Sequence, residues 1–540
     1  MAEPFNATTY LVDARLAEGA GDRIAVRRGD DTLTYAELCD LTARVAAAFR
    51  ALDLRREERV MFVMSDGLEL LAGILGAFRA GLVAVPVSTM YTGPELGSIL
   101  ADSGARTLVV TPEFAAAAEE ALALAPDVAH VIIAGEPVHP VSWTDWAAFL
   151  AGGADGSGAV APTTEDSPAL WLYTSGTTGT PKAAMHRHAN IRHVVETYGK
   201  QVLQISPDDV CFSVAKMFFA YGIGNSVFFP LAVGASAVLE PRRPSPAVAA
   251  EVMARYRPTL FFAGPTFFAA LLGAGLPEDT FVSVRTCASA GEALPPALYG
   301  RFTARFGVDI LDGIGSTECL HIFISNRSGD VRAGTSGRPV PGYEVELRGP
   351  GGVITEAEVP GALYVRGASL ASGYWCRTDA TRAVFQGEWL RTGDTYVRTH
   401  DGYYACLGRD DDLLKAGGIW VSPSEVEDRL LQHPSVAEVV LVGVPDADGL
   451  DKPVACVVAA EGQTVDPEVL VAFCREGLAA FKRPRAVLVV DALPKTATGK
   501  MQRYRVREML AAEYPELTVA PPSTVDAGGS GVPAGAGLTS

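Results

Sequence analysis

Short β-branched segments alternate with longer amphipathic ones along most of this chain. Residues 35–52 have the spacing of a helix, whereas residues 59–63, 108–111 and 130–134 are typical of buried strands. Regular alternation of this kind places helices on both faces of a sheet. The pattern therefore predicts an α/β fold whose sheets are mostly parallel.

The pattern changes twice toward the C-terminus. From about Arg332, glycines interrupt strand-like segments, which predicts a β-rich subdomain. Beyond Arg409 a shorter α+β pattern begins. There we expect helices at 424–431 and 467–478 and strands at 436–443 and 453–459.

These changes divide the chain into three parts. We expect a large N-terminal domain, residues 1–410, of two mostly parallel sheets with helices plus the β-rich subdomain. A small α+β C-terminal domain follows at residues 411–513. Residues 514–540 are rich in Gly, Pro, Ala and Ser, bury too little surface to order themselves, and are expected to be a disordered tail.

Composition narrows the class of protein. With 540 residues, 48% of them hydrophobic, the chain can bury a large core. Its formal charge of −18 disfavours nucleic acid as a partner. The start lacks a basic segment followed by an apolar one, and Gly, Arg and Pro interrupt the apolar stretch at 70–87. We therefore expect a cytoplasmic protein without a membrane span, whose eight scattered cysteines are reduced and mostly buried.

A loop suited to phosphate follows the strand-like residues 169–172. Residues 173–182 read YTSGTTGTPK, in which glycines permit close backbone approach and hydroxyls donate hydrogen bonds to phosphate oxygens. A flexible surface loop is the alternative explanation. A Walker loop requires Gly-Lys-Ser/Thr, but Gly179 is followed by Thr180, Pro181 and Lys182. The segment thus predicts a nucleotide site of another type and excludes a P-loop ATPase.

With this loop the sequence resembles the adenylate-forming superfamily of acyl-CoA synthetases, peptide-synthetase adenylation domains and luciferases. Four further segments resemble that family's motifs in the family order, and the resemblance covers about residues 8–510. They are DGIGSTE at 312–318, RTGD at 391–394, GRDDDLLKAGG at 408–418 and PKTATGK at 494–500. Each short motif alone is also found in ordinary turns and helix starts. The resemblance to the family therefore rests on all of the motifs occurring in the family order.

The resemblance implies site residues and cofactors. It assigns catalysis to Lys500, Thr317 and Glu318, with Glu318 as the ligand of Mg²⁺. It assigns ATP binding to Thr174, Ser175, Gly176, Thr177, Thr178, Gly179, Lys182, Gly291, Glu292, Asp312, Asp394 and Arg409. Gly291 and Glu292 are equally explained by a strand-turn-helix connection. The C-terminal domain would be mobile about a hinge at Asp411, with Gly417, Gly418 and Trp420 along a CoA channel, although Trp420 is equally explained as a packing aromatic.

The acid-binding segment looks most like that of benzoate-CoA ligases. The pocket residues this implies are Phe219, Ala220, Tyr221, Gly222, Gly315, His321 and Ile322. Ala220 and Gly222 would leave room for a flat ring and Tyr221 would form an aromatic wall. His321 either meets the acid or is a core histidine bonded to backbone. Many superfamily members have a Tyr that stacks on adenine at the position of Ile314. Benzoate-type ligases commonly have Ile there, as this chain does.

The histidines at 186, 188 and 193 lack carboxylate or thiolate neighbours for a metal site, so we expect them at a solvated or CoA-adjacent helix start.

The predicted reaction joins a small aromatic acid to CoA with ATP and Mg²⁺, through an aryl-adenylate, giving aryl-CoA, AMP and pyrophosphate. Transfer to a carrier-protein thiol is the nearest alternative. A silent nucleotide- or acid-binding protein is another, disfavoured by the intact motifs. Ring substituents and pathway are not readable, and a homodimer is simply the commonest assembly.

Overall fold

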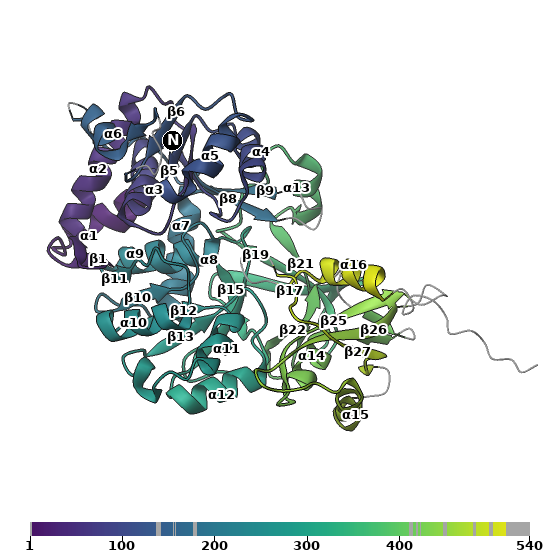
Figure 1. The fold of residues 1–540 in the computed structure, drawn as a ribbon. Coiled ribbons are helices and arrows are strands. Elements are labelled where there is room, and N and C mark those ends of the chain that lie inside the picture. The colour runs from purple at the N-terminus through teal and green to yellow at the C-terminus, as the bar shows by residue number, and fades with distance from the viewer. Residues whose placement is uncertain are drawn as a thin grey trace, which may run out of the picture. The chain divides into compact units, whose positions relative to one another are not determined.

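The computed structural model describes residues 3–136, 142–154, 156, 158–175, 181–409, 414–416, 419–421, 423–445, 451–478, 482–495 and 501–514. The chain divides into an N-terminal unit, residues 1–411, and a C-terminal unit, residues 412–540. Figure 1 shows helices around the sheets of the N-terminal unit.

The first sheet of the N-terminal unit has, among the described residues, seven strands in the order β7-β6-β5-β3-β4-β8-β9. All neighbours are parallel except β9, which is antiparallel to β8. The strands are β3 (Arg59–Val63), β4 (Val83–Pro86), β5 (Thr107–Val110), β6 (His130–Ile133), β7 (Thr144–Asp145), β8 (Pro168–Ser175) and β9 (Pro181–Arg187). The helices that precede or connect these strands are α2 (Tyr35–Ala51), α3 (Leu68–Ala80), α4 (Gly93–Ser103), η2 (Pro112–Phe114), α5 (Ala115–Leu122) and α6 (Trp146–Gly152).

Alternation along β3 explains why helices cover both faces of this sheet. Val60 and Phe62 belong to the core cluster that includes α2 and α3, whereas Met61 and Val63 belong to the cluster that includes α4 and α5. Successive side chains of a strand point to opposite faces, so a strand apolar on both faces requires a layer on each side.

The second sheet has nine strands in the described part of the chain, in the order β16-β15-β14-β13-β12-β10-β11-β1-β2. Its central strands are parallel, while β2, β15 and β16 run antiparallel to their neighbours. The strands are β1 (Ile24–Arg28), β2 (Asp31–Thr34), β10 (Val210–Ser213), β11 (Ser236–Val238), β12 (Leu260–Ala263), β13 (Thr286–Ser289), β14 (Ile310–Gly315), β15 (Ile322–Ser325) and β16 (Arg338–Pro339).

Helices flank this second sheet as well. They are η1 (Thr9–Asp13), α1 (Ala14–Ala17), α7 (His188–Val194), η3 (Val195–Val202), α8 (Ala220–Ile223), η4 (Gly224–Phe228), α9 (Phe229–Val233), α10 (Pro246–Tyr256), α11 (Pro265–Gly273), η5 (Glu278–Phe281) and α12 (Pro296–Phe306). Three of them, η1, η3 and η4, are π-helical, a rare geometry that is frequent at functional sites. Leu260 and Phe262 of β12 share one core cluster with Phe62 of β3, so a single core joins the two sheets.

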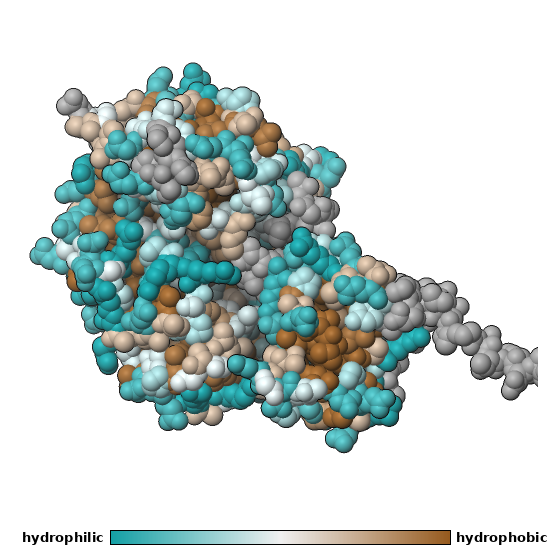
Figure 2. Space-filling model, in the orientation of Figure 1, coloured by the Kyte–Doolittle hydropathy of each residue, from teal (hydrophilic) through white to brown (hydrophobic). Residues whose placement is uncertain are grey.

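An antiparallel β-rich subdomain completes the N-terminal unit. It contains β17 (Tyr343–Gly349), β18 (Gly352–Ile354), β19 (Gly361–Gly367), β20 (Phe385–Gln386), β21 (Trp389–Arg398), β22 (Tyr404–Arg409) and the helix α13 (Thr378–Val384). The described part of the C-terminal unit contains β23 (Leu414–Ala416), β24 (Ile419–Val421), α14 (Pro423–Leu431), β25 (Val436–Pro445), β26 (Asp451–Ala459), α15 (Pro467–Gly477), β27 (Ala486–Val489) and α16 (Arg503–Glu513). Figure 2 shows an apolar patch on the viewed face of this unit, near β25 and β27.

The predicted fold class is confirmed: mostly parallel sheets with helices, a β-rich subdomain and a small C-terminal α+β unit. The eight cysteines are unpaired, and five of them are buried. Within the described ranges, no helix is long and apolar enough to cross a membrane.

The connection between α6 and β8 is partly buried. Between α6 and β8, Ala161 and Thr163 are 9% and 4% exposed, because the N-terminal segment covers them. Asn6 Nδ2 donates to Thr163 Oγ1 at 3.0 Å, and the Phe5 amide donates to the Thr163 carbonyl.

Candidate adenylation site

The hairpin of β8 and β9 fixes both ends of the predicted phosphate loop. Thr174 pairs with Lys182 and Ser175 with Pro181. Residues 176–180, which include Gly176, Thr177, Thr178 and Gly179, lie outside the described residues. The loop therefore begins at the carboxyl end of β8, and open α/β sheets bind ligands at the carboxyl ends of their parallel strands.

A strained turn carries Thr317 and Glu318 between β14 and β15. The Cys319 amide donates to the Ser316 carbonyl and the Leu320 amide to the Thr317 carbonyl, each at 3.2 Å. Leu320 has φ +67° although it is fully buried and is not a glycine. Such a conformation costs on the order of 1–3 kcal/mol and persists only where the surroundings determine it. The turn is thus held in one shape by its packing.

His186 of β9 holds this turn through a side-chain hydrogen bond. Its Nε2–H donates to the Thr317 carbonyl at 2.8 Å, while its Nδ1 accepts from Asn190 Nδ2 at 2.9 Å. Burial lowers the pKa of His186 to about 4, so the ring is neutral and can make both bonds.

The expectation of a solvated helix start is wrong for His186 and His188, whereas His193 is half-buried. His186 and His188 are fully buried, because β9 and α7 lie beneath the N-terminal segment and residues 369–370. The Ala7 amide donates to His188 Nδ1 at 3.1 Å. Sequence reasoning missed His186 as a support for the site. The available signal was its strand position, on the same face as the buried Ala184.

Glu318 is half-buried, and its Oε1 accepts a hydrogen bond from the Tyr374 hydroxyl at 2.6 Å. The same tyrosine ring lies 5.6 Å from the Lys182 ammonium, as measured to the ring centroid. Lys182 and Glu318 were both predicted as site residues and lie far apart in sequence. In the structure both contact the side chain of Tyr374.

The predicted ribose ligands are also adjacent. Asp394 of β21 pairs with Arg409 of β22, and Arg409 Nη1 lies 3.0 Å from Asp394 Oδ1. The Asp394 side chain is 14% exposed and that of Arg409 is 50% exposed. An oriented carboxylate beside a cation can accept hydrogen bonds from vicinal hydroxyl groups.

Three further predicted ATP-binding residues, Gly291, Glu292 and Asp312, follow β13 or lie on β14. Gly291 is exposed with φ +101°, a backbone conformation that favours glycine. Glu292 Oε2 accepts from Thr266 Oγ1 at 3.2 Å. Asp312 pairs with Ser289 across the two strands and is 6% exposed, and burial raises the pKa of its carboxyl group well above the usual value.

Aromatic rings enclose His321 in the predicted acid pocket. Its ring centroid lies 4.6 Å from that of Phe229, 5.1 Å from that of Tyr198 and 5.5 Å from that of Tyr221. His321 is 2% exposed, and in the described part of the chain neither ring nitrogen has a hydrogen bond of normal geometry. Burial lowers its pKa to about 3, while the Tyr221 backbone opposes that shift. The ring is therefore neutral.

Backbone fills the space beside the two predicted pocket glycines. A Cβ on Gly222 would lie 1.9 Å from the Lys216 carbonyl oxygen, and one on Gly315 would lie 2.6 Å from the His321 carbonyl oxygen. The expectation that Gly222 leaves room for a ring is therefore wrong, because the chain itself occupies that room. Ala220 and Ile322 are 8% and 1% exposed, and Phe219 and Tyr221 are half-buried.

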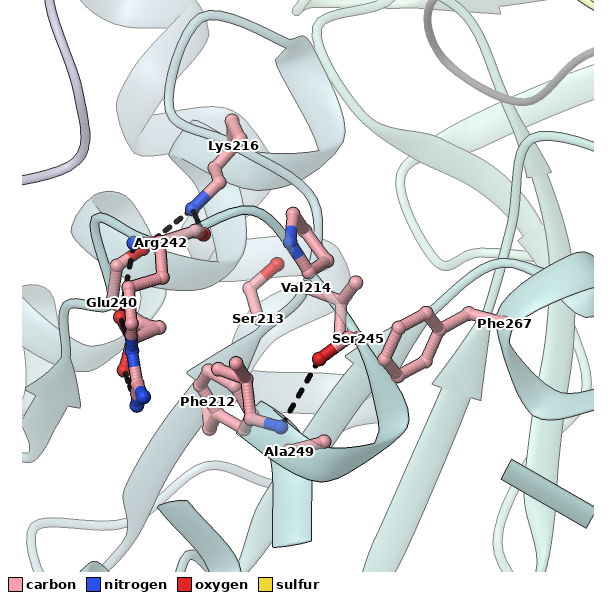
Figure 3. Close-up of a pocket in the computed structure, with 11 residues that line it drawn as sticks. Phe212, Ser213, Val214, Lys216, Glu240, Arg242, Ser245, Ala249 and Phe267 are labelled. Atoms are coloured by element: carbon pink, nitrogen blue, oxygen red, sulfur yellow. Dashed lines mark hydrogen bonds and ion pairs between the residues drawn. The ribbon is translucent and has the colours of Figure 1, made fainter. Parts of the chain in front are cut away.

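A small pocket lies beside the start of this segment (Figure 3). Lys216 donates to the carbonyl oxygen of Arg242 at 2.9 Å, and Arg242 is ion-paired with Glu240 and Glu251. None of the seven predicted pocket residues lines it. The pocket is therefore distinct from the predicted acid site.

The remaining predicted residues belong to the second unit or its boundary. Asp411, Gly417, Gly418 and Lys500 lie outside the described residues. For Trp420 only the backbone is described, in β24.

The neutral state of His321 gives a testable pH dependence. Its folded pKa is far below that of an unfolded histidine, so the unfolded chain binds the extra proton and stability falls as pH drops below about 6.5. Between about pH 7 and pH 5 this loss is about 2 kcal/mol for one histidine. We expect His321→Leu to lose that much less stability than the wild-type protein over this range, as measured by urea unfolding at both pH values.

The control is His400→Gln, at an exposed position of the same unit. It should follow the wild-type pH dependence. Equal pH dependence in His321→Leu and the wild type would contradict the assignment of a buried neutral ring.

Comparison with known proteins places this geometry in a family. The model of the AMP-binding enzyme family matches residues 13–375, and that of its C-terminal domain matches residues 425–500. The chain is 43% identical to a benzoate-CoA ligase of Thauera aromatica over 94% of this chain and 96% of the relative.

Two solved structures are similar over nearly the whole chain. A benzoate CoA ligase from Burkholderia xenovorans LB400 is 42% identical with a TM-score of 0.85, covering 93% of this chain and 100% of that one. The anthranilate CoA ligase AuaEII in complex with anthranoyl-AMP is 37% identical with a TM-score of 0.87, covering 95% and 99%. The chain belongs to the AMP-binding enzyme family, and within this adenylate-forming family it is most similar to benzoate-CoA ligases.

Proposed function

We propose that this enzyme joins an aromatic carboxylic acid, benzoate or a substituted benzoate, to CoA. The first step forms an aryl-adenylate and pyrophosphate from ATP, and the second gives aryl-CoA and AMP. The observation that carries the proposal is the similarity to benzoate-CoA ligase over 94% of the chain, in a structure that brings Lys182 and Glu318 to one side chain.

The proposed adenylation chemistry depends on stabilising negative charge. A carboxylate that attacks the α-phosphate brings two anions together, so preorganised positive and hydrogen-bonding groups lower the barrier. In the proposal Lys500 and the hydroxyls of the loop after β8 supply these groups. Asp394 accepts hydrogen bonds from the ribose and fixes the nucleotide in line with the acid.

The donor set suits magnesium. Mg²⁺ is usually held by one or two carboxylates together with substrate phosphates and water. Glu318 is a partly exposed carboxylate near Lys182 and the hairpin that carries the loop. When bound there, Mg²⁺ would offset the charge of the polyphosphate. In the proposal the ion is held by Glu318, and Thr317 presents its hydroxyl to phosphate while His186 holds its carbonyl.

We assign the acid to the segment from Phe219 to Tyr221 and to the turn that carries His321. The small side chain of Ala220 and the aromatic rings of Tyr221 and His321 suit a flat ring. Rotation of residues 411–513 about Asp411 would then exchange Lys500 for the CoA channel at Gly417, Gly418 and Trp420.

Product analysis across related acids tests the proposed function. With ATP, Mg²⁺ and CoA, we expect AMP release and a thioester of matching mass for benzoate or its hydroxy, amino or halo derivatives, but little for hexanoate. Each substituent should change the selectivity by about 1–3 kcal/mol at most, because one group in an apolar pocket contributes little more. AMP release without formation of the CoA thioester would indicate that the acyl acceptor is a carrier-protein thiol. Preference for hexanoate would contradict the aromatic assignment.

A larger side chain at Ala220 tests the acid site separately. We expect Ala220→Leu to raise KM for benzoate by about 10-fold or more while KM for ATP stays near the wild-type value, because overpacking costs about 1–3 kcal/mol only where the ring binds. Steady-state AMP release measures both constants. The matched control is Ala270→Leu on the exposed side of α11, which should change neither. Equal increases in both KM values for Ala220→Leu would place the acid elsewhere.

A further inference from the structure

Tyr374 links the carboxylate of Glu318 to the strand that follows the phosphate loop. The tyrosine is 7% exposed, and its hydroxyl donates to Glu318 Oε1 at 2.6 Å across 56 positions of sequence. Within the described ranges, no hydrogen bond to the other oxygen, Oε2, is formed. One oxygen of the carboxylate is therefore fixed, and the other remains available to a ligand.

The backbone on both sides of Tyr374 is bonded to β9. The Met185 amide donates to the Gly373 carbonyl at 3.0 Å, and the Trp375 amide donates to the Ala183 carbonyl at 3.0 Å. Lys182, the next residue along β9, carries its ammonium to 5.6 Å from the centre of the Tyr374 ring. The backbone around Tyr374 is therefore held against the strand that follows the phosphate loop.

A second set of contacts, to Asp102, holds the same segment. Arg377 Nη2 lies 2.6 Å from Asp102 Oδ1 on α4, and Trp375 Nε1 donates to the Asp102 carbonyl at 2.9 Å. Tyr173 of β8 donates to Asp102 Oδ2 at 2.8 Å. Figure 1 shows β8, β9, α4 and α13 in the same region of the N-terminal unit. Tyr374 thus has little freedom to follow Glu318 if the carboxylate rotates.

We propose that Tyr374 is a positioning residue that presents the Glu318 carboxylate to the Mg²⁺ of bound MgATP. The inference rests on the proposed adenylation function. A glutamate on a turn has several side-chain rotamers, and a rigid donor on one oxygen selects the one in which the other oxygen meets the ion. Loss of such an outer-shell partner typically lowers metal affinity by about 10- to 100-fold.

Tyr374→Phe removes the hydroxyl and keeps the ring, including its contact with Phe385 at 5.5 Å between centroids. We expect Mn²⁺ to bind about 10-fold more weakly to the variant than to the wild type in the presence of a non-hydrolysable ATP analogue. Electron paramagnetic resonance of free Mn²⁺ measures this without turnover. The Mg²⁺ concentration for half-maximal benzoate-dependent AMP formation should rise by a similar factor.

Tyr343→Phe is the matched control. Tyr343 is 6% exposed, and its hydroxyl lies 2.6 Å from Ser369 Oγ rather than from Glu318. This variant should bind Mn²⁺ as the wild type does. Unchanged Mn²⁺ affinity in Tyr374→Phe, or equal weakening in Tyr343→Phe, would overturn the proposal.

A double-mutant cycle separates positioning from a general loss of structure. If Tyr374 acts through Glu318, then Tyr374→Phe should weaken Mn²⁺ binding little further in a Glu318→Gln background. Additive losses would contradict that route. Failure of the wild-type protein to form AMP from any aromatic acid would instead refute the proposed function, and the Mn²⁺ measurement would remain a separate test of Tyr374.

Discussion

The geometry of the site depends on one hydrogen-bonded seam between three segments that are far apart in sequence. β9 follows the phosphate loop, the turn at 316–321 carries Thr317 and Glu318, and residues 371–375 lie between them. The Ala371 amide donates to the Glu318 carbonyl at 2.8 Å, and His186 of β9 donates to the neighbouring Thr317 carbonyl. Because buried backbone groups must be paired, breaking one of these bonds costs more than the bond alone. The seam therefore keeps the phosphate-binding elements in register.

The buried histidines of this region are neutral. Burial lowers the pKa of His186 to about 4 and of His321 to about 3, so neither adds a positive charge near neutral pH. The positive charge needed by a polyphosphate then falls to lysine and to Mg²⁺ in the proposed reaction. A neutral imidazole can also donate and accept at once, as His186 does between Asn190 and Thr317.

The sequence predicted the layers of the fold, because periodicity records which face of a strand or helix is buried. The helix expected at 35–52 occurs at Tyr35–Ala51, and the strand expected at 59–63 has those bounds. Motif order likewise pointed to Glu318 and Lys182, which the structure brings to Tyr374.

Long-range contacts limited what the sequence could predict about the site. Neither His186 nor Tyr374 was identified as a support, since each acts through a bond to a residue more than fifty positions away. Gly222 was misjudged for a related reason: the Lys216 carbonyl, brought close by the turn into α8, occupies the space that its missing side chain leaves. A glycine shows only that something comes close, and does not show whether that is a ligand or the chain.

Exchange of labelled pyrophosphate into ATP tests the central claim most directly. If the enzyme forms an aryl-adenylate before the thiol reacts, exchange should require both Mg²⁺ and the aromatic acid and should proceed without CoA. Thioester formation from ATP without any such exchange, or with ADP as the product, would contradict an adenylate mechanism for this chain.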